Sequence, residues 1–187
     1  EYTWNLDPLY HGFDDPRYAA DLDTLRAQVE KLTALPEKLP GMAPTEGLKA
    51  GIAILEQMEE LTSKLFLYAE LRQSVNTRDP EPGSKIGQIM TVYSAAAAPR
   101  AAFQAWIAKL DLTEALADPQ LKDYAFLLTR TQENSKYLLA GDGEAVAARF
   151  GISGGSAWSE MQQYLTSTVK VNYRGTVTNL SSIRNMA

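Results

Sequence analysis

Apolar residues recur at helical spacing along most of the chain. After the Asp-Pro pair at 15–16 they fall at every third or fourth position until Pro36, which predicts an amphipathic helix over 16–35. A second run predicts a long helix over 45–76, because neither proline nor a turn cluster interrupts it. Asp caps a helix and Pro fits its first position, so this dipeptide is typical of a helix start.

Two further Asp-Pro pairs, at 79–80 and 118–119, predict helix starts for 80–110 and 119–134. Pro99 lies inside the first of these helices. Proline has no N–H to donate and crowds the preceding turn, so we expect a kink near this residue.

The last third of the chain changes period. A short helix over 144–150 is expected to end at Gly151, and Ser156 can cap another over 156–166. Apolar residues then alternate, with a turn at Arg174-Gly175, which predicts a hairpin over about 167–180. Ser181 to Asn185 resembles the first turn of a helix that does not continue, so we infer a truncated chain.

These elements predict a mainly α fold, an antiparallel helical bundle of about six helices with a small C-terminal β-hairpin. The helices are expected over 16–35, 45–76, 80–110, 119–134, 144–150 and 156–166. We expect a single helical domain over 1–187. Residues 65–69 are apolar on every side, which predicts that neighbouring elements cover them all round, and Glu60 with Lys64 is expected to form a solvent-facing pair.

Composition narrows the class of protein. The net charge of −5 comes from scattered residues with no basic cluster, so nucleic acid is not an expected partner. No apolar run approaches the roughly 20 residues that cross a bilayer, and no membrane partner is expected. The absence of cysteine excludes disulfides. The N-terminus has no signal-peptide pattern, which favours a cytoplasmic location.

Few residues are candidates for chemistry. His11 is the only histidine, so this chain cannot form a two-histidine zinc site, and a structural or surface role is favoured. Ser153 lies in a Gly-x-Ser-x-Gly sequence, but a helix is predicted before it and His11 lies upstream of it, opposite to the hydrolase order. A glycine-rich helix connection is the simpler interpretation.

Acidic and aromatic clusters also have simpler explanations. Acidic residues at helix starts and on polar faces are explained by the helix dipole and by solvent better than by cation binding or acid–base chemistry. They are Asp14, Asp15, Asp21, Asp23, Glu56, Glu59 and Glu60. The three tryptophans and nine tyrosines could line a peptide-binding surface, but most lie on apolar stripes, which favours core packing.

Three stretches together resemble the N-terminal region of the oligoendopeptidase F family of thimet-oligopeptidase-like zinc metallopeptidases. They are 4–10 (WNLDPLY), 67–80 (LYAELRQSVNTRDP) and 154–171 (GGSAWSEMQQYLTSTVKV). Their order and spacing match as well. The matching residues that we interpret as architectural are Trp4, Leu6, Tyr10, Tyr68, Arg72, Asp79, Gly155, Ser156, Trp158 and Thr168.

The resemblance implies a complete zinc metalloendopeptidase whose C-terminal catalytic domain, absent from this chain, carries His-Glu-x-x-His. No catalytic or metal-binding residue is transferred to any position here, no substrate-binding residue is assigned, and the chain alone is expected to bind no zinc and to be inactive. The resemblance also implies that this chain forms a wall or lid of a channel that admits short unfolded peptides. The alternative is a free-standing helical binding or scaffold domain. A small hydrolase built on Ser153 conflicts with the helical context.

Overall fold

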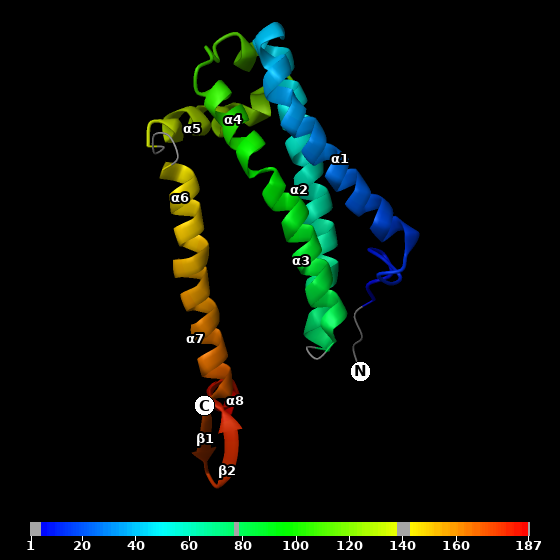
Figure 1. Cartoon of the computed structure of the whole chain (residues 1–187), viewed down its shortest axis with the longest axis vertical. Coiled ribbons are helices and arrows are strands. Elements are labelled where there is room, and N and C mark those ends of the chain that lie inside the picture. Colours follow the sequence, from blue (N-terminus) through cyan, green and yellow to red (C-terminus); the bar gives the residue numbers. More distant parts are fainter. Residues whose placement is uncertain (1–4, 77–78, 138–142, 187) are drawn as a thin grey trace. The chain divides into compact units, whose positions relative to one another are not determined.

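The computed structural model describes residues 5–76, 79–137 and 143–186. They form two compact units, Glu1–Lys136 and Tyr137–Ala187, which are described separately below. Trp4 lies outside the described residues. The predicted fold class, mainly α with a small C-terminal antiparallel hairpin, is confirmed (Figure 1). Within the described ranges, no helix is long and apolar enough to span a bilayer.

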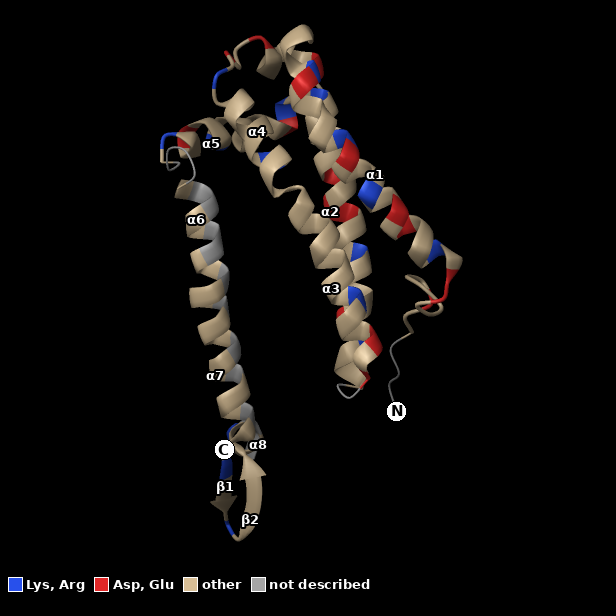
Figure 2. Cartoon of the chain, in the orientation of Figure 1, with Lys and Arg blue, Asp and Glu red and all other residues tan. Residues whose placement is uncertain are grey.

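The first unit begins with two long helices, α1 (Pro16–Lys38) and α2 (Pro44–Val75), joined by a 3₁₀ turn at Leu39–Gly41. Asp15 caps α1 by accepting the N–H of Arg17 at 2.9 Å. The predicted end before Pro36 is too early, because this proline lies in the last turn, where its missing N–H removes only one helical hydrogen bond. Acidic and basic residues are intermingled along both helices (Figure 2).

The predicted helix over 80–110 is two helices, α3 (Pro80–Ala95) and α4 (Ala97–Ile107), with a break at Ala96. Pro99 would donate to the carbonyl of Ala95 in a continuous helix, and it has no N–H to do so. The interruption therefore lies where the proline predicts it, although it ends the helix instead of bending it. α3 lies beside α2 (Figure 1), and α4 packs against α1.

The predicted helix over 119–134 begins later than expected. The 3₁₀ turns Ala115–Ala117 and Lys122–Tyr124 precede α5 (Ala125–Ser135). Asp118 accepts the N–H of Gln120 and pairs with Lys49 of α2 at 2.8 Å. Because Leu121 is also buried, these tertiary contacts fix a tight turn where helical periodicity favoured an α-helix.

Two glycines of α2 let aromatic side chains of α4 lie against the α2 backbone. A Cβ at Gly51 would lie 2.0 Å from Cζ of Phe103, and one at Gly47 would lie 2.6 Å from Cη2 of Trp106. These two rings stack with centroids 5.8 Å apart. Phe103 is 1% exposed and belongs to the continuous apolar core of this unit. The predicted all-round burial of 65–69 is wrong at Leu67, which is 47% exposed.

The second unit is a helical segment followed by a hairpin. α6 (Gly143–Phe150), a π-helical segment (Gly151–Ser156) and α7 (Ala157–Thr168) follow one another without a break. The predicted helix end at Gly151 is therefore wrong. Among the described glycines only Gly175 has a positive φ, so Gly151 does not adopt the left-handed conformation of a C-terminal cap.

The hairpin confirms the predicted turn. Strands β1 (Lys170–Tyr173) and β2 (Thr176–Asn179) pair antiparallel, with Tyr173 opposite Thr176. Arg174 has φ 52° and Gly175 has φ 83°. Two positive φ angles are the geometry of a type I′ turn, whose twist suits a two-residue hairpin connection. Helix α8 (Leu180–Met186) follows, and the side chain of Asn179 accepts the N–H of Ser182 at 2.8 Å.

Candidate functional site

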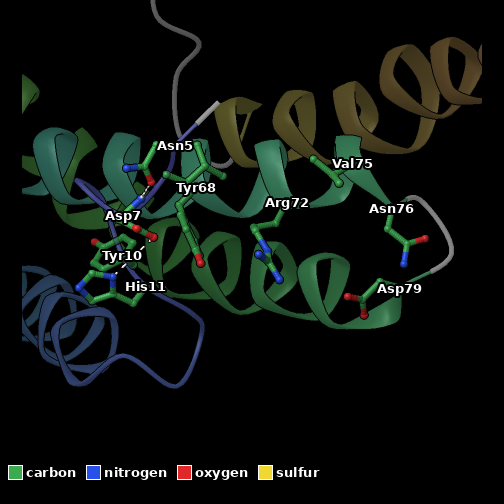
Figure 3. Close-up of a pocket in the computed structure, with 10 residues that line it drawn as sticks. Asn5, Asp7, Tyr10, His11, Tyr68, Arg72, Val75, Asn76 and Asp79 are labelled. Carbon is green, nitrogen blue, oxygen red and sulfur yellow. Dashed lines mark hydrogen bonds and ion pairs between the residues drawn. The ribbon is translucent and has the colours of Figure 1, made fainter. Parts of the chain in front are cut away.

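A pocket of about 390 Å³ lies in the first unit, between the N-terminal segment and the C-terminal end of α2 (Figure 3). Its lining residues combine charged, amide, aromatic and apolar side chains. They are Asn5, Leu6, Asp7, Tyr10, His11, Tyr68, Arg72, Val75, Asn76 and Asp79. The pocket therefore offers both polar and apolar surface, which suits a small ligand that carries both kinds of group.

The helical repeat of α2 places its contribution along one face. Tyr68, Arg72 and Val75 are separated by four and three residues, so they follow one another along this helix (Figure 3). Asp79 then reaches the pocket from the start of α3, where its Oδ1 accepts the N–H of Glu81 at 3.0 Å. The carboxylate is held by its role as helix cap.

A short turn shapes the opposite wall. The N–H groups of Leu9 and Tyr10 both donate to the carbonyl of Leu6, at 2.9 and 3.1 Å. Asp7 donates its N–H to Oδ1 of Asn5 at 2.9 Å, and its Oδ1 lies 3.5 Å from Nδ1 of His11. His11 is largely exposed, so it takes the surface position that the sequence favoured.

Four aromatic rings fasten this turn to the helices. Tyr10 packs edge-on against Tyr18 and Tyr68, with centroids 5.1 and 5.2 Å apart, and Phe13 packs edge-on against the same two rings at 5.4 and 5.2 Å. Edge-to-face contacts align the positive edge of one ring with the negative face of another. Burial raises the pKa of Tyr18 to about 12, so its phenol stays neutral at ordinary pH.

A partly buried polar network lies beside the ring cluster. The Tyr10 hydroxyl donates to Oδ2 of Asp21 at 2.7 Å, and Nζ of Lys64 donates to the same oxygen at 2.7 Å. Lys64 also lies 4.7 Å from the centre of the Tyr10 ring. The predicted Glu60–Lys64 pair is wrong, because Asp21 of α1 provides the lysine's partner. Burial, together with the bond to Asp21, raises the pKa of Tyr10 well above its ordinary value.

The carboxylates of Asp15 and Asp21 are expected to make the stability of the first unit sensitive to acid. Hydrogen bonds from the Arg17 side chain, then from the N–H groups of His11 and Arg17, hold the pKa of Asp15 well below its usual range. Burial raises the pKa of Asp21, but bonds from Lys64 and Tyr10 outweigh it, so the net shift is downward.

A carboxyl whose folded pKa is depressed adds stability above its unfolded pKa of about 3.9, and this stability is lost as pH falls toward the folded pKa. We expect the urea midpoint to fall as pH decreases below about 4. In Asp15→Asn the fall should be shallower. An unchanged slope in that variant would mean that Asp15 does not contribute to the pH dependence.

The polar groups that line the pocket differ in whether they already have a partner within the protein. Asp7 faces His11, and Asp79 caps α3. The side chain of Arg72, by contrast, has no ion pair or hydrogen bond to any residue in the described ranges, and no dashed line reaches it in Figure 3. The Tyr68 ring is buried, yet its hydroxyl has no bond to a described residue and is not sealed from solvent.

Five of the architectural residues predicted from the sequence line this one pocket. They are Leu6, Tyr10, Tyr68, Arg72 and Asp79. Of those in the second unit, Trp158 is 68% exposed, Gly155 is exposed, and Thr168 donates its hydroxyl to the carbonyl of Leu165. Ser156 lies in the π-helical segment, and its side chain is outside the described atoms. That these residues are architectural stays a prediction.

The sequence did not select Asn5, Asp7 or Asn76 for this pocket. The spacing of Asp7 and His11, four residues apart, was a usable signal, because such a spacing lets two side chains meet within one turn. Convergence with α2 had no signal in the sequence pattern, since it depends on how the N-terminal segment folds back.

Neither the pocket nor the rest of the described chain fits a resident metal. No group of three or more His, Cys, Asp and Glu side chains within the described ranges can hold an ion. Ser153 lies in the π-helical segment, and the element before it is helical, so the strand-to-helix turn that a serine nucleophile needs does not precede it.

A second hollow, of about 430 Å³, lies along α2 in the same unit. It is lined by Ile52, Leu55, Glu56, Glu59, Tyr124 and Leu127. Its two carboxylates are already engaged: Glu56 accepts from the Tyr124 hydroxyl, and Glu59 accepts from Tyr93 and Arg100 at 2.9 Å. The remaining surface is mostly apolar.

In a comparison with known proteins, one part of the chain matches the model of a peptidase family. Residues 97–170, from α4 to the first residue of β1, match the N-terminal peptidase M3 family described as Oligopeptidase F. The match confirms the resemblance to an oligoendopeptidase F N-terminal region that the sequence motifs predicted. It covers less than half of the chain, and the motifs at 4–10 and 67–80 lie outside it. No curated protein and no solved structure matches the chain.

Proposed function

We propose that this chain is the non-catalytic N-terminal domain of a zinc-dependent oligoendopeptidase that hydrolyses short peptides. The match of residues 97–170 to the Oligopeptidase F family carries the proposal. The sequence agrees with a non-catalytic part, because its single histidine cannot supply the two imidazoles of a zinc peptidase site. In this proposal the zinc and the catalytic residues belong to a separate C-terminal domain, and the enzyme works in the cytoplasm.

The role of the domain is to form part of the wall or lid of the substrate channel. Long helices packed side by side, such as α1, α2 and α3, make a stiff surface because their apolar faces interlock in one core. A stiff wall can exclude folded proteins by size while it admits extended peptides. Gating of this kind is steric and needs no reactive side chain in the wall.

The proposal is tested with the product of the whole reading frame and a version that lacks residues 1–187. We expect the whole protein to contain zinc and to cleave short quenched-fluorescence peptides but not long ones. The deletion should either fail to fold or lose the length limit, because the wall is gone. If the deleted protein folds and keeps the same activity and length preference, the wall is not its function.

A free-standing helical binding domain is the second candidate, and the apolar hollow between α2 and α5 favours it. Its surface of Ile52, Leu55 and Leu127 can receive the apolar face of a partner helix. The same reading frame separates the two candidates. A His-Glu-x-x-His sequence downstream supports the peptidase, and a stop codon directly after Ala187 supports the binding domain.

A further inference from the structure

Arg72 differs from the other described arginines of the first unit. Arg17, Arg26, Arg100 and Arg130 each lie within 3.2 Å of a carboxylate oxygen. Arg72 faces the pocket of Figure 3 and has no such partner in the described part of the chain. A guanidinium presents its donors in a planar fork that matches a carboxylate in two parallel hydrogen bonds.

Tyr68 adds a second donor at the same place. It precedes Arg72 by one helical turn, so both side chains lie on one face of α2 and reach the pocket (Figure 3). The hydroxyl of Tyr10 is taken by Asp21, whereas that of Tyr68 makes no hydrogen bond to a described residue. A ring that is 1% exposed holds this hydroxyl in a fixed position.

We propose that this pocket binds a carboxylate at the end or on a side chain of a short peptide. The Arg72 guanidinium takes the two carboxylate oxygens, and the Tyr68 hydroxyl donates to one of them. Leu6 and Val75 give the adjoining apolar group a surface. At about 390 Å³ the pocket is near the lower end of ligand sites, which suits the end of a peptide better than a long run of residues.

The two carboxylates of the lining repel this ligand less than Arg72 attracts it, because both already face partners within the protein. Asp79 is engaged with the start of α3, and Asp7 faces the imidazole of His11. They do limit the charge that the pocket accepts, because a ligand with two adjacent negative groups would place one near a carboxylate. A single carboxylate is therefore favoured over a phosphate. The choice of a peptide as the ligand rests on the proposed function, whereas carboxylate recognition by Arg72 and Tyr68 does not.

Binding to the whole chain is measured by titration calorimetry at low salt with three probes. These are acetyl-Ala-Ala-Leu with a free C-terminus, the same peptide as its C-terminal amide, and acetyl-Ala-Glu-Leu amide. We expect the free acid to bind at least about tenfold more tightly than the plain amide, since the amide lacks the charge for Arg72. Equal binding of the first two probes, or no binding by any, overturns the proposal.

The third probe separates the two sources of the carboxylate. If the glutamate-containing amide binds like the free acid, the pocket accepts acidic side chains; if it binds like the plain amide, the pocket is specific for a chain terminus. Both results support carboxylate recognition provided that the free acid binds.

Variants then locate the site. Arg72→Gln should weaken the free acid about tenfold and leave the amide unchanged, and Tyr68→Phe should weaken it about threefold. Arg130→Gln on α5 is the matched control and should change nothing, because Arg130 already pairs with Glu133 on the surface. Circular dichroism checks that each variant is folded. Undiminished binding by a folded Arg72→Gln protein overturns the site.

Discussion

A Gly51→Val variant is expected to lower the free energy of unfolding of the first unit by about 3 kcal/mol. A Cβ at this position would lie 2.0 Å from one ring carbon of Phe103 and 2.5 Å from another. Phe103 is 1% exposed and stacks on Trp106, so the ring cannot swing into solvent to make room. The valine must therefore push α2 and α4 apart, which opens gaps elsewhere in the core.

The matched control is Gly87→Val on α3. Apart from the adjoining residues and backbone of its own helix, no described atom lies within 4 Å of a Cβ built at Gly87, and the residue is exposed. Valine has a slightly better helix propensity than glycine, so this variant should stay within about 0.5 kcal/mol of the parent. Urea unfolding in a Trp158→Phe background, followed by tryptophan fluorescence, reports on the first unit. Equal midpoints for the two valine variants would show that α2 and α4 do not pack closely.

A second substitution tests whether Phe103 is the cause. Phe103→Ala alone should cost about 3–5 kcal/mol, because it leaves a cavity in a packed core. Combined with Gly51→Val, the total should be smaller than the sum of the two separate losses, since the valine then occupies part of the vacated space. Strict additivity would mean that the two positions do not touch.

Local patterns were sufficient for most of the helices and for the hairpin. The Asp-Pro pairs at 15–16 and 79–80 mark the starts of α1 and α3, because capping and the fixed φ of proline act within one turn. Arg174-Gly175 marks the turn between β1 and β2 for a similarly local reason. In each case the signal lies within a few residues of the structure that it predicts.

Errors arise where distant contacts decide the backbone or the partner. Asp118 pairs with Lys49 of α2, and a 3₁₀ turn follows at the position where the sequence predicted the first turn of an α-helix. Lys64 bonds to Asp21, which is remote in sequence, and not to Glu60 on the same helix. The error at the π-helical segment Gly151–Ser156 has a local cause instead, since glycine permits a helix end without requiring one.

One wall of the pocket could be predicted from local sequence, and the other depends on distant contacts. Its α2 face could be predicted, because Tyr68 and Arg72 are one turn apart in a long helix. Its other wall could not, because Asp7 and His11 reach α2 only after the N-terminal segment folds back against the aromatic cluster. Described residues of the motifs at 4–10 and 67–80, which the family resemblance selected separately, line this one pocket.

The packing of the N-terminal segment against α2 depends on the Tyr68 ring. We therefore expect Tyr68→Ala to lower the free energy of unfolding by about 3–5 kcal/mol. The ring is 1% exposed and makes edge contacts with Tyr10 and Phe13, both in the segment that precedes α1. Its loss leaves a cavity between that segment and α2. Because a domain of this size is stable by about 5–15 kcal/mol in total, the effect should be visible as a large drop in urea midpoint.

Tyr68→Phe separates packing from hydrogen bonding at the same position. The hydroxyl of Tyr68 has no bond to a described residue, so removing it should change the free energy of unfolding by less than about 0.5 kcal/mol. Limited proteolysis provides the local readout: residues 5–15 should become cleavable in Tyr68→Ala and stay protected in Tyr68→Phe. Protection in both variants would show that the N-terminal segment is held by Asp21, Lys64 and Asp15 without help from the ring, and that the pocket wall does not depend on it.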